Sequence, residues 1–284
     1  MSKKARTSFN RLKSRMKDLP SIPSSLARII KILDDPGSSA RDLGRAIGRD
    51  QAVTAKILRI VNSAYYGFPR RIDALDHAVA VLGYRSIREI VLVTTLLDEA
   101  SNSRNIPTLD RKQLWEHAAA CGGAARTIAQ KTGALKADSV FLAGLLHDIG
   151  KVFLDAFLGS EYEVVVKTAR EQGILLIEAE EKILGANHTD FGHWLSEEWN
   201  LPPNLSQAVL YHHQPHLASD HYILACLVHL GDIMARTLEY GHGGDDAMPE
   251  VNRQAWASLN LTPRLWAEIT KEFGEQHSPL GALF

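Results

Sequence analysis

The stretch SVFLAGLLHDIGK, residues 139–151, decides the fold of this chain. Its apolar residues recur at the spacing of one helix face: Phe141, Leu142, Leu145 and Leu146. His147 and Asp148 follow directly after Leu146, and Lys151 comes three residues after Asp148. Because a buried carboxylate without a partner is strongly destabilising, Asp148 must face a cation, a strong donor or a cavity.

The same helical spacing extends outward along the chain. Apolar residues recur every three or four positions in three further segments: Leu26, Ile29, Ile30 and Leu33; Val53, Ile57, Ile60 and Val61; Leu75, Val79 and Leu82. Capping-box spacing occurs at residues 39–42 and 86–89, and glycines at positions 37, 83, 133 and 185 follow periodic runs, where helices usually end. No segment alternates like a strand. We therefore predict an all-α fold.

Composition indicates a globular protein without a bulk attraction to polyanions. The 284 residues are 45% hydrophobic and 23% charged, and the formal net charge is -1. Seven lysines and arginines lie within residues 1–17, which we interpret as a solvated basic arm of no assigned role. The only cysteines, Cys121 and Cys226, lie in apolar stretches and indicate a reducing compartment. With no signal peptide and no apolar run of ~20 residues, we expect a cytoplasmic protein that binds neither nucleic acid nor membrane.

A polar stretch at residues 98–110, DEASNSRNIPTLD, is the best candidate for a junction between subdomains. We place the boundary near residue 108. The predicted organisation is a basic arm, an N-terminal helical part, a second helical part that carries the histidines, and a C-terminal helical extension: residues 1–17, 18–108, 109–240 and 241–284.

Four segments besides the His-Asp pair direct a histidine or an acid toward the interior, as judged from the neighbouring apolar residues: His117, His188, His212 and Asp232. For one histidine alone, a hydrogen-bonded core residue is the commoner explanation. Several imidazoles and carboxylates that converge are satisfied most simply by a divalent metal. His229, three residues before Asp232, competes as a ligand or as a neighbour that supports one, but it is not assigned to the ligand set. Lys151 is either a phosphate-binding group or a solvent-exposed lysine at a helix end.

The order of these residues resembles the metal-ligand order of the HD superfamily of metal-dependent phosphohydrolases, and LLHDIGK is similar to the signature around its His-Asp dyad. The resemblance implies a multi-helix bundle with two metal ions. It implies that one ion is held by His117, His147, Asp148 and Asp232. It implies that the second, bridged by Asp148, is held by His188, His212 and His213. Iron or manganese is favoured by the resemblance, and zinc or nickel also suits such ligands.

The first half resembles the HDOD domain, an HD-related output module of bacterial signalling proteins. The similarity rests on LPSIP at 19–23 and on residues 50–67 and 72–88, and the two resemblances together cover about residues 17 to 240. The polar run Asn62-Ser63-Ala64-Tyr65-Tyr66, within the matching segment, is interpreted as a structural cap and turn and not as a catalytic group. HDOD proteins commonly lack part of the metal constellation, whereas this chain has every ligand type. The Gly-Tyr-Pro triplet of the HD-GYP phosphodiesterases is missing, because Gln214-Pro215-His216 follows the paired histidines.

Together these features predict a bacterial signalling protein with a retained HD-type metal site that hydrolyses a phosphate ester or nucleotide. Asp148 and Lys151 are the predicted catalytic residues, with the lysine contacting a phosphate oxygen. The expected partners are a phosphate-containing small molecule or nucleotide and a signalling protein. The alternative is a non-catalytic interaction module for signal transduction whose metal site is structural or vestigial.

Overall fold

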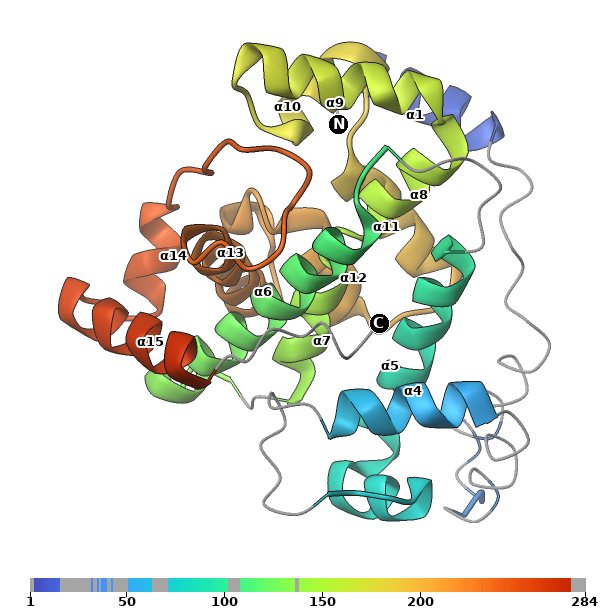
Figure 1. Ribbon diagram of the computed structural model, residues 1–284, viewed down its shortest axis with the longest axis vertical. Helices are drawn as coiled ribbons and strands as arrows, with labels where there is room; N and C mark the ends of the chain where they lie inside the picture. The colour runs from blue at the N-terminus through green and yellow to red at the C-terminus, as the bar shows by residue number, and fades with distance from the viewer. Residues whose placement is uncertain are drawn as a thin grey trace. The chain divides into compact units, whose positions relative to one another are not determined.

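The computed structural model describes residues 3–15, 32, 35, 37–39, 42, 51–62, 71–101, 108–135 and 138–276 (Figure 1). Within these residues every regular element is a helix, and no strand occurs, so the all-α prediction is confirmed. The motif at residues 19–23, the apolar residues Leu26, Ile29, Ile30 and Leu33, and much of the polar junction lie outside the described residues.

The described helices fall into two compact units. The smaller unit contains α4 (Gln51–Val61) and α5 (Leu75–Ser101), and Gly83, with φ 80°, interrupts the helical geometry of α5. The Asn62 side chain, just beyond α4, connects the end of that helix to the segment before α5. Its Nδ2 donates to Leu58 O at 2.7 Å and to Ile72 O at 2.6 Å, while its Oδ1 accepts from Ile72 N at 2.6 Å. Asn62 therefore has a structural role, whereas residues 63–66 of the same predicted cap and turn lie outside the described residues.

The larger unit is a helical bundle built around α6. Its elements are α1 (Lys3–Arg15), α6 (Arg111–Thr132), α7 (Asp138–Leu146), α8 (Ile149–Leu158), α9 (Ser160–Gln172), α10 (Leu176–Leu184), α11 (His188–Glu198), α12 (Pro203–Tyr211), η1 (Pro215–Leu217), α13 (Tyr222–Thr237), α14 (Arg253–Ser258) and α15 (Pro263–Gln276). Helix α6 packs mainly against α7 and α13, and α11 packs against α8 and α12 (Figure 1).

Glycines let the helices of the larger unit approach backbone to backbone. A Cβ on Gly144 of α7 would collide with Gly122 of α6, and a Cβ on Gly150 of α8 would collide with the carbonyl of His188. Only glycine has no Cβ to prevent such contact. These contacts bring the histidine of α11 and the residues between α7 and α8 into one region.

The basic N-terminal segment forms helix α1 and not a solvated arm, so that expectation is wrong for residues 3–15. Leu12 is buried, and the Phe9 ring lies 4.8 Å from the ring of Phe191 on α11. Lys13 lies 4.7 Å above the ring of Trp194. The interpretation from the basic residues overlooked two apolar residues, Phe9 and Leu12, which are spaced to share one helix face.

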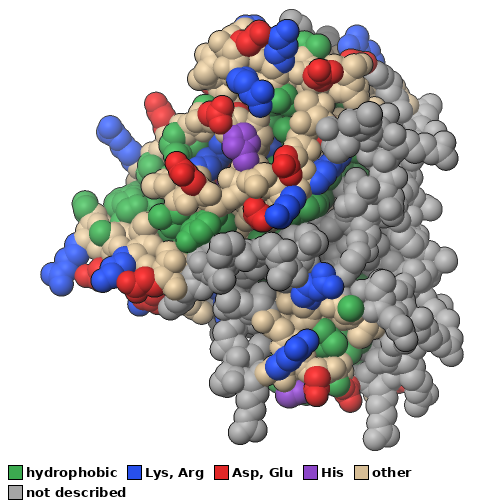
Figure 2. All heavy atoms as spheres, in the orientation of Figure 1, with side chains coloured by type: hydrophobic (Ala, Val, Ile, Leu, Met, Phe, Trp, Pro, Cys, Tyr) green, Lys and Arg blue, Asp and Glu red, His purple; other side chains and the backbone are tan. Residues whose placement is uncertain are grey.

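The visible face of the larger unit carries acidic and basic side chains that are interspersed, without a continuous basic patch among the described residues (Figure 2). Both cysteines are free and buried, as expected for core residues. Among the described helices, none combines the length and the apolar character needed to cross a membrane.

Candidate metal centre

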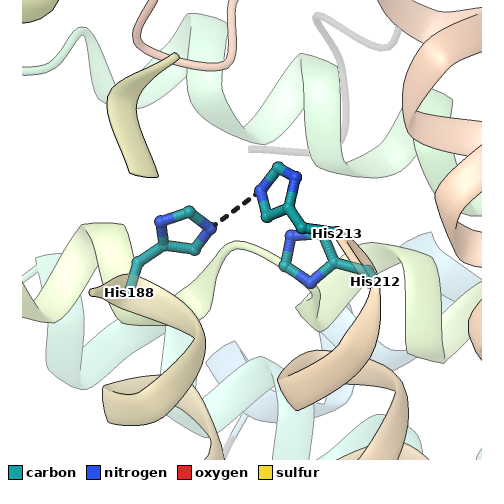
Figure 3. A group of neighbouring side chains, drawn as sticks. All are labelled: His188, His212 and His213. Carbon is teal, nitrogen blue, oxygen red and sulfur yellow. Dashed lines mark hydrogen bonds between the residues drawn. The ribbon is translucent and has the colours of Figure 1, made fainter. Parts of the chain in front are cut away.

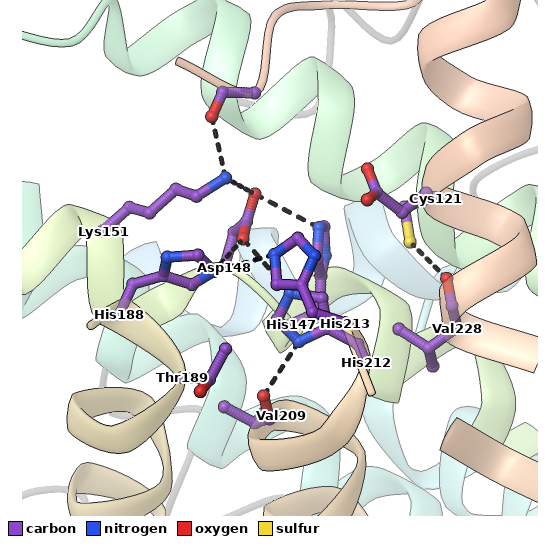
Figure 4. Close-up of polar contacts among 12 residues, drawn as sticks. Cys121, His147, Asp148, Lys151, His188, Thr189, Val209, His212, His213 and Val228 are labelled. Atoms are coloured by element: carbon purple, nitrogen blue, oxygen red, sulfur yellow. Dashed lines mark hydrogen bonds and ion pairs between the residues drawn. The ribbon is translucent and has the colours of Figure 1, made fainter. Parts of the chain in front are cut away.

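All seven predicted metal ligands lie in one cluster inside the larger unit. Figure 4 shows His147, Asp148, His188, His212 and His213 close together. They come from α6, from the turn between α7 and α8, from the start of α11, from the residues after α12 and from α13: His117, His147, Asp148, His188, His212, His213 and Asp232. Six of them are at most 2% exposed, whereas His213 is partly exposed. The cluster therefore lies nearest to solvent at His213.

The His-Asp dyad occupies a break between two helices. Helix α7 ends at Leu146 and α8 begins at Ile149, so His147 and Asp148 form the turn that joins them. Asp148 is the N-cap of α8, yet its side chain makes no capping hydrogen bond. The carboxylate is therefore free to point into the cluster, where the dipole of α8 also favours a negative charge.

The first group consists of His117, His147 and Asp148, whose potential ligand atoms lie within 4.8 Å of one another. Asp148 Oδ2 lies 3.2 Å from His147 Nε2 and 3.9 Å from His117 Nε2. Asp232 completes this side, because its Oδ1 is 3.0 Å from His117 Nε2. This is the set that the resemblance assigned to one ion.

The second group consists of His188, His212 and His213, again with ligand atoms within 4.8 Å of one another (Figure 3). The Nε2 atoms of His188 and His213 are 3.2 Å apart. Asp148 Oδ1 lies 3.4 Å from His188 Nε2 and 3.7 Å from His212 Nε2. One oxygen of Asp148 thus faces the first group and the other faces the second.

Hydrogen bonds on the outer side of the imidazoles direct their free lone pairs inward. His147 Nδ1 donates to Gly144 O at 2.6 Å, and His212 Nδ1 donates to Val209 O at 2.8 Å. Because carbonyl oxygens only accept, Nδ1 carries the proton in both rings and Nε2 is left as an acceptor. The two Nε2 atoms and Asp148 Oδ1 are buried without a hydrogen-bond partner among the described residues. A divalent cation would satisfy these atoms, so the residues fit a metal.

The electrostatics of the cluster also suit a cation. Burial disfavours the Asp148 carboxylate, but His147 and Lys151 outweigh it and hold the pKa of Asp148 well below its usual value. Burial, reinforced by His147, lowers the pKa of His212 well below its usual value. At His147 burial opposes protonation, but Asp148 outweighs it and raises the pKa well above its usual value. These directions favour an ionised Asp148 and a neutral His212. The negative charge of Asp148 that raises the pKa of His147 would also attract a metal ion, which would take the place of a proton on His147 Nε2.

Lys151 is buried in the cluster, so its alternative role as a solvent-exposed lysine is wrong. Its Nζ donates to Asp148 Oδ2 at 2.7 Å and to Gly243 O at 2.8 Å. The predicted contact between Lys151 and a phosphate stays a prediction. Because Lys151 lies within α8, one turn after Asp148, its side chain reaches back over the carboxylate.

A loop at residues 238–252, between α13 and α14, lies against the first group and was not predicted to take part in the site. A Cβ on Gly243 would lie 3.4 Å from His117 Nε2. Asp245 anchors the loop by accepting from Arg236 Nη1 and from Leu176 N, each at 3.1 Å. Arg236 in turn donates to Asp232 Oδ1 at 2.9 Å. The loop and the acid of the first group are therefore joined through one arginine.

His229 supports the cluster and does not face it. Its Nδ1 donates to His212 O at 2.8 Å, and its Nε2 accepts from Asn252 N at 3.0 Å. Because both ring nitrogens are engaged, the structure favours the supporting role over the ligand role. Sequence spacing placed His229 near Asp232 but gave no sign of its partners.

The architecture of the larger unit is an all-α bundle around a buried cluster of histidines and acids that fits divalent metal. A family model described as the HDOD domain matches residues 19–215. The chain belongs to the HDOD domain family. An uncharacterized protein of Treponema pallidum (strain Nichols) is 30% identical over 233 residues, which are 79% of this chain and 44% of that relative. The chain thus spans less than half the length of this relative.

Solved structures show the same fold. An HDOD domain protein of unknown function from Geobacter sulfurreducens superposes with a TM-score of 0.79 at 27% identity, over 98% of this chain and 97% of that one. A protein of Shewanella amazonensis SB2B, named as a candidate phosphohydrolase, gives a TM-score of 0.71 at 19% identity, over 96% of each chain. At 19% identity the likeness shows the fold alone.

Proposed function

We propose that this HDOD protein is a metal-dependent phosphohydrolase that holds two divalent ions and acts on a phosphate ester or nucleotide. The observation that carries the proposal is the division of Asp148, with Oδ2 toward the first group and Oδ1 toward the second. A carboxylate between two sets of imidazoles is the arrangement that a pair of metal ions requires. The name of the Shewanella structure is consistent with this activity.

His117, His147 and Asp232 would hold one ion with Asp148, and His188, His212 and His213 would hold the other. When bound, divalent metals of this kind lower the pKa of water and offset the charge of a phosphate ester. Iron or manganese is our first expectation, from the resemblance, with zinc and nickel also suited to imidazole and carboxylate ligands.

Lys151 is the proposed phosphate-binding residue. An ammonium group can only donate hydrogen bonds, and in this structure it donates to Asp148 and to Gly243 O. To reach a substrate it must exchange at least one of these acceptors for a phosphate oxygen. The substrate would enter on the side of the partly exposed His213.

The alternative function is a non-catalytic module that docks a signalling protein, with a metal that only ties helices together. The burial of six of the seven ligands favours this alternative, because a structural metal site is closed whereas a catalytic one keeps an open position.

The test is metal analysis combined with hydrolysis. Protein purified without chelator should carry one to two transition-metal ions per chain and should hydrolyse a generic phosphodiester, a phosphomonoester or a nucleotide. Protein that carries no metal would contradict the proposal. Full metal content without hydrolysis of any of the three substrates would favour the interaction module.

A further inference from the structure

We propose that Glu180 is a positioning residue for the second group: its carboxylate orients His188 and strengthens it as a metal ligand. This inference rests on the proposed function, because it concerns the ion that the second group would hold. Neither helical spacing nor the resemblance drew attention to Glu180, which lies among charged neighbours in the sequence EAEEK.

Glu180 is a completely buried acid on α10. Its Oε2 accepts from His188 Nδ1 at 2.6 Å and from His188 N at 2.7 Å, while its Oε1 accepts from Tyr162 OH at 2.6 Å. Both carboxylate oxygens are therefore used. Two of the three donors belong to the same histidine, so the position of His188 is fixed at its backbone and at its ring.

The local fold explains why Glu180 reaches this histidine. Gly185 ends α10 in the left-handed conformation, with φ 71°, and Asn187 caps α11. Asn187 Oδ1 accepts from Thr189 N and Asp190 N, which leaves the N–H of His188 at the helix start without a partner inside the helix. Glu180 supplies that partner.

The ring contact determines which nitrogen of His188 is free. Because a carboxylate oxygen accepts, Nδ1 carries the proton, and Nε2 presents its lone pair to the second group. That Nε2 lies 3.4 Å from Asp148 Oδ1 and 3.2 Å from His213 Nε2. Glu180 thus selects the ring form that can bind metal.

His188 also differs from the two other imidazoles whose outer bonds are known. His147 and His212 donate to neutral backbone carbonyls, whereas His188 donates to a carboxylate. The second group contains three imidazoles and faces only one carboxylate oxygen, Oδ1 of Asp148. Glu180 therefore adds negative charge where the ligands have little of their own, which makes the bound imidazole more basic.

The decisive variant is Glu180→Gln, which keeps the length and shape of the side chain but removes its charge. We expect metal content to fall by about one ion per chain and the affinity of the weaker ion to fall 10- to 100-fold. The first group should keep its ion. Metal is measured by plasma mass spectrometry after dialysis against buffered metal, with circular dichroism to establish that the variant is folded.

Two matched controls separate charge at His188 from general packing. Glu181→Gln changes the neighbouring exposed glutamate, whose side chain accepts from Asn187 Nδ2 at 2.9 Å, and should leave metal content unchanged. Tyr162→Phe removes the donor to Oε1 but leaves both contacts to His188, and should lower thermal stability more than metal affinity.

A second measurement on the wild-type protein covers the case in which Glu180→Gln fails to fold. Nitrogen-15 NMR of zinc-loaded protein, with the signal assigned through His188→Gln, should show the His188 proton on Nδ1. A proton on Nε2 would overturn the inference, as would a folded Glu180→Gln variant with wild-type affinity for two ions. Wild-type protein that binds no metal would instead contradict the proposed function itself.

Discussion

Lys151 Nζ lies 2.7 Å from Asp148 Oδ2. The two residues are three positions apart in the sequence, and both side chains are almost completely buried. This oxygen is the one that faces the first group. A lysine that donates to it reduces its availability to a cation. Metal binding at the first group and the Lys151 hydrogen bond therefore compete for one atom.

Lys151→Met should keep the metal and lose turnover. The variant removes the ammonium but retains a long apolar side chain, so the first group should bind its ion at least as tightly as in the wild type. Hydrolysis of a phosphodiester should fall at least about tenfold, which corresponds to about 1.4 kcal/mol of lost transition-state stabilisation. Parallel metal analysis and kinetics check this, and loss of metal together with activity would contradict the phosphate-binding role.

In the metal-free state, the same variant should be destabilised. Breaking a buried ion pair by removing one partner costs about 3 kcal/mol or more, because the other charge is left uncompensated. Thermal unfolding of Lys151→Met in chelator should therefore start well below that of wild type. Added metal should restore most of the difference, since a cation replaces the lost ammonium beside Asp148.

Asp148→Ala should remove both ions and any hydrolysis together. No other described carboxylate has one oxygen toward each group, so neither ion keeps its shared ligand. Asp190→Ala is a suitable control, because this partly exposed acid on α11 lies in neither metal-binding group. Metal content near zero in Asp148→Ala and unchanged in Asp190→Ala is the expected result, whereas a variant that retains two ions would refute the bridging role.

Local periodicity predicted the helices and the inward direction of His117, His188, His212 and Asp232. His213 and the assignment of the ligands to two ions came from the resemblance and not from periodicity. An imidazole on an apolar stripe, such as His117 beside Leu114, shows its inward direction without knowledge of the fold. The division of the two oxygens of Asp148 between the groups depends on how four helices meet, and no spacing along the chain encodes it.

Other parts of the site could not be predicted, for a different reason. Glu180 lies next to Glu178 and Glu181 and shares their residue type, so only tertiary packing distinguishes the buried acid from its exposed neighbours. The loop at 238–252 has no periodicity, and its role depends on distant contacts such as Asp245 with Leu176 N. The burial of Leu12 was likewise not predicted, because the basic residues around it in α1 indicated a solvated segment.

Gly150→Ala should disrupt the contact between α8 and α11. The new Cβ would collide with the carbonyl of His188, and overpacking of this kind costs about 1 to 3 kcal/mol. Because the collision displaces His188 from Asp148, metal at the second group should be lost as well. Gly274→Ala is the matched control, since a Cβ there meets nothing within 4 Å and lies in helix α15. That control should stabilise the protein by about 0.5 to 1 kcal/mol, as measured by denaturant unfolding.

Asn62→Ala tests whether the smaller unit takes part in metal binding. The variant deletes three hydrogen bonds and leaves the N–H and C=O of Ile72 without their partner, which should cost about 1 to 3 kcal/mol. Arg71→Ala, at the exposed residue before Ile72, controls for a change in the same segment and should have little effect. Proteolysis should therefore cleave the smaller unit of Asn62→Ala faster than that of wild type. Metal content should stay at the wild-type value, because every predicted ligand lies in the larger unit. A folded Asn62→Ala protein that has lost its metal would show that the smaller unit contributes to the site.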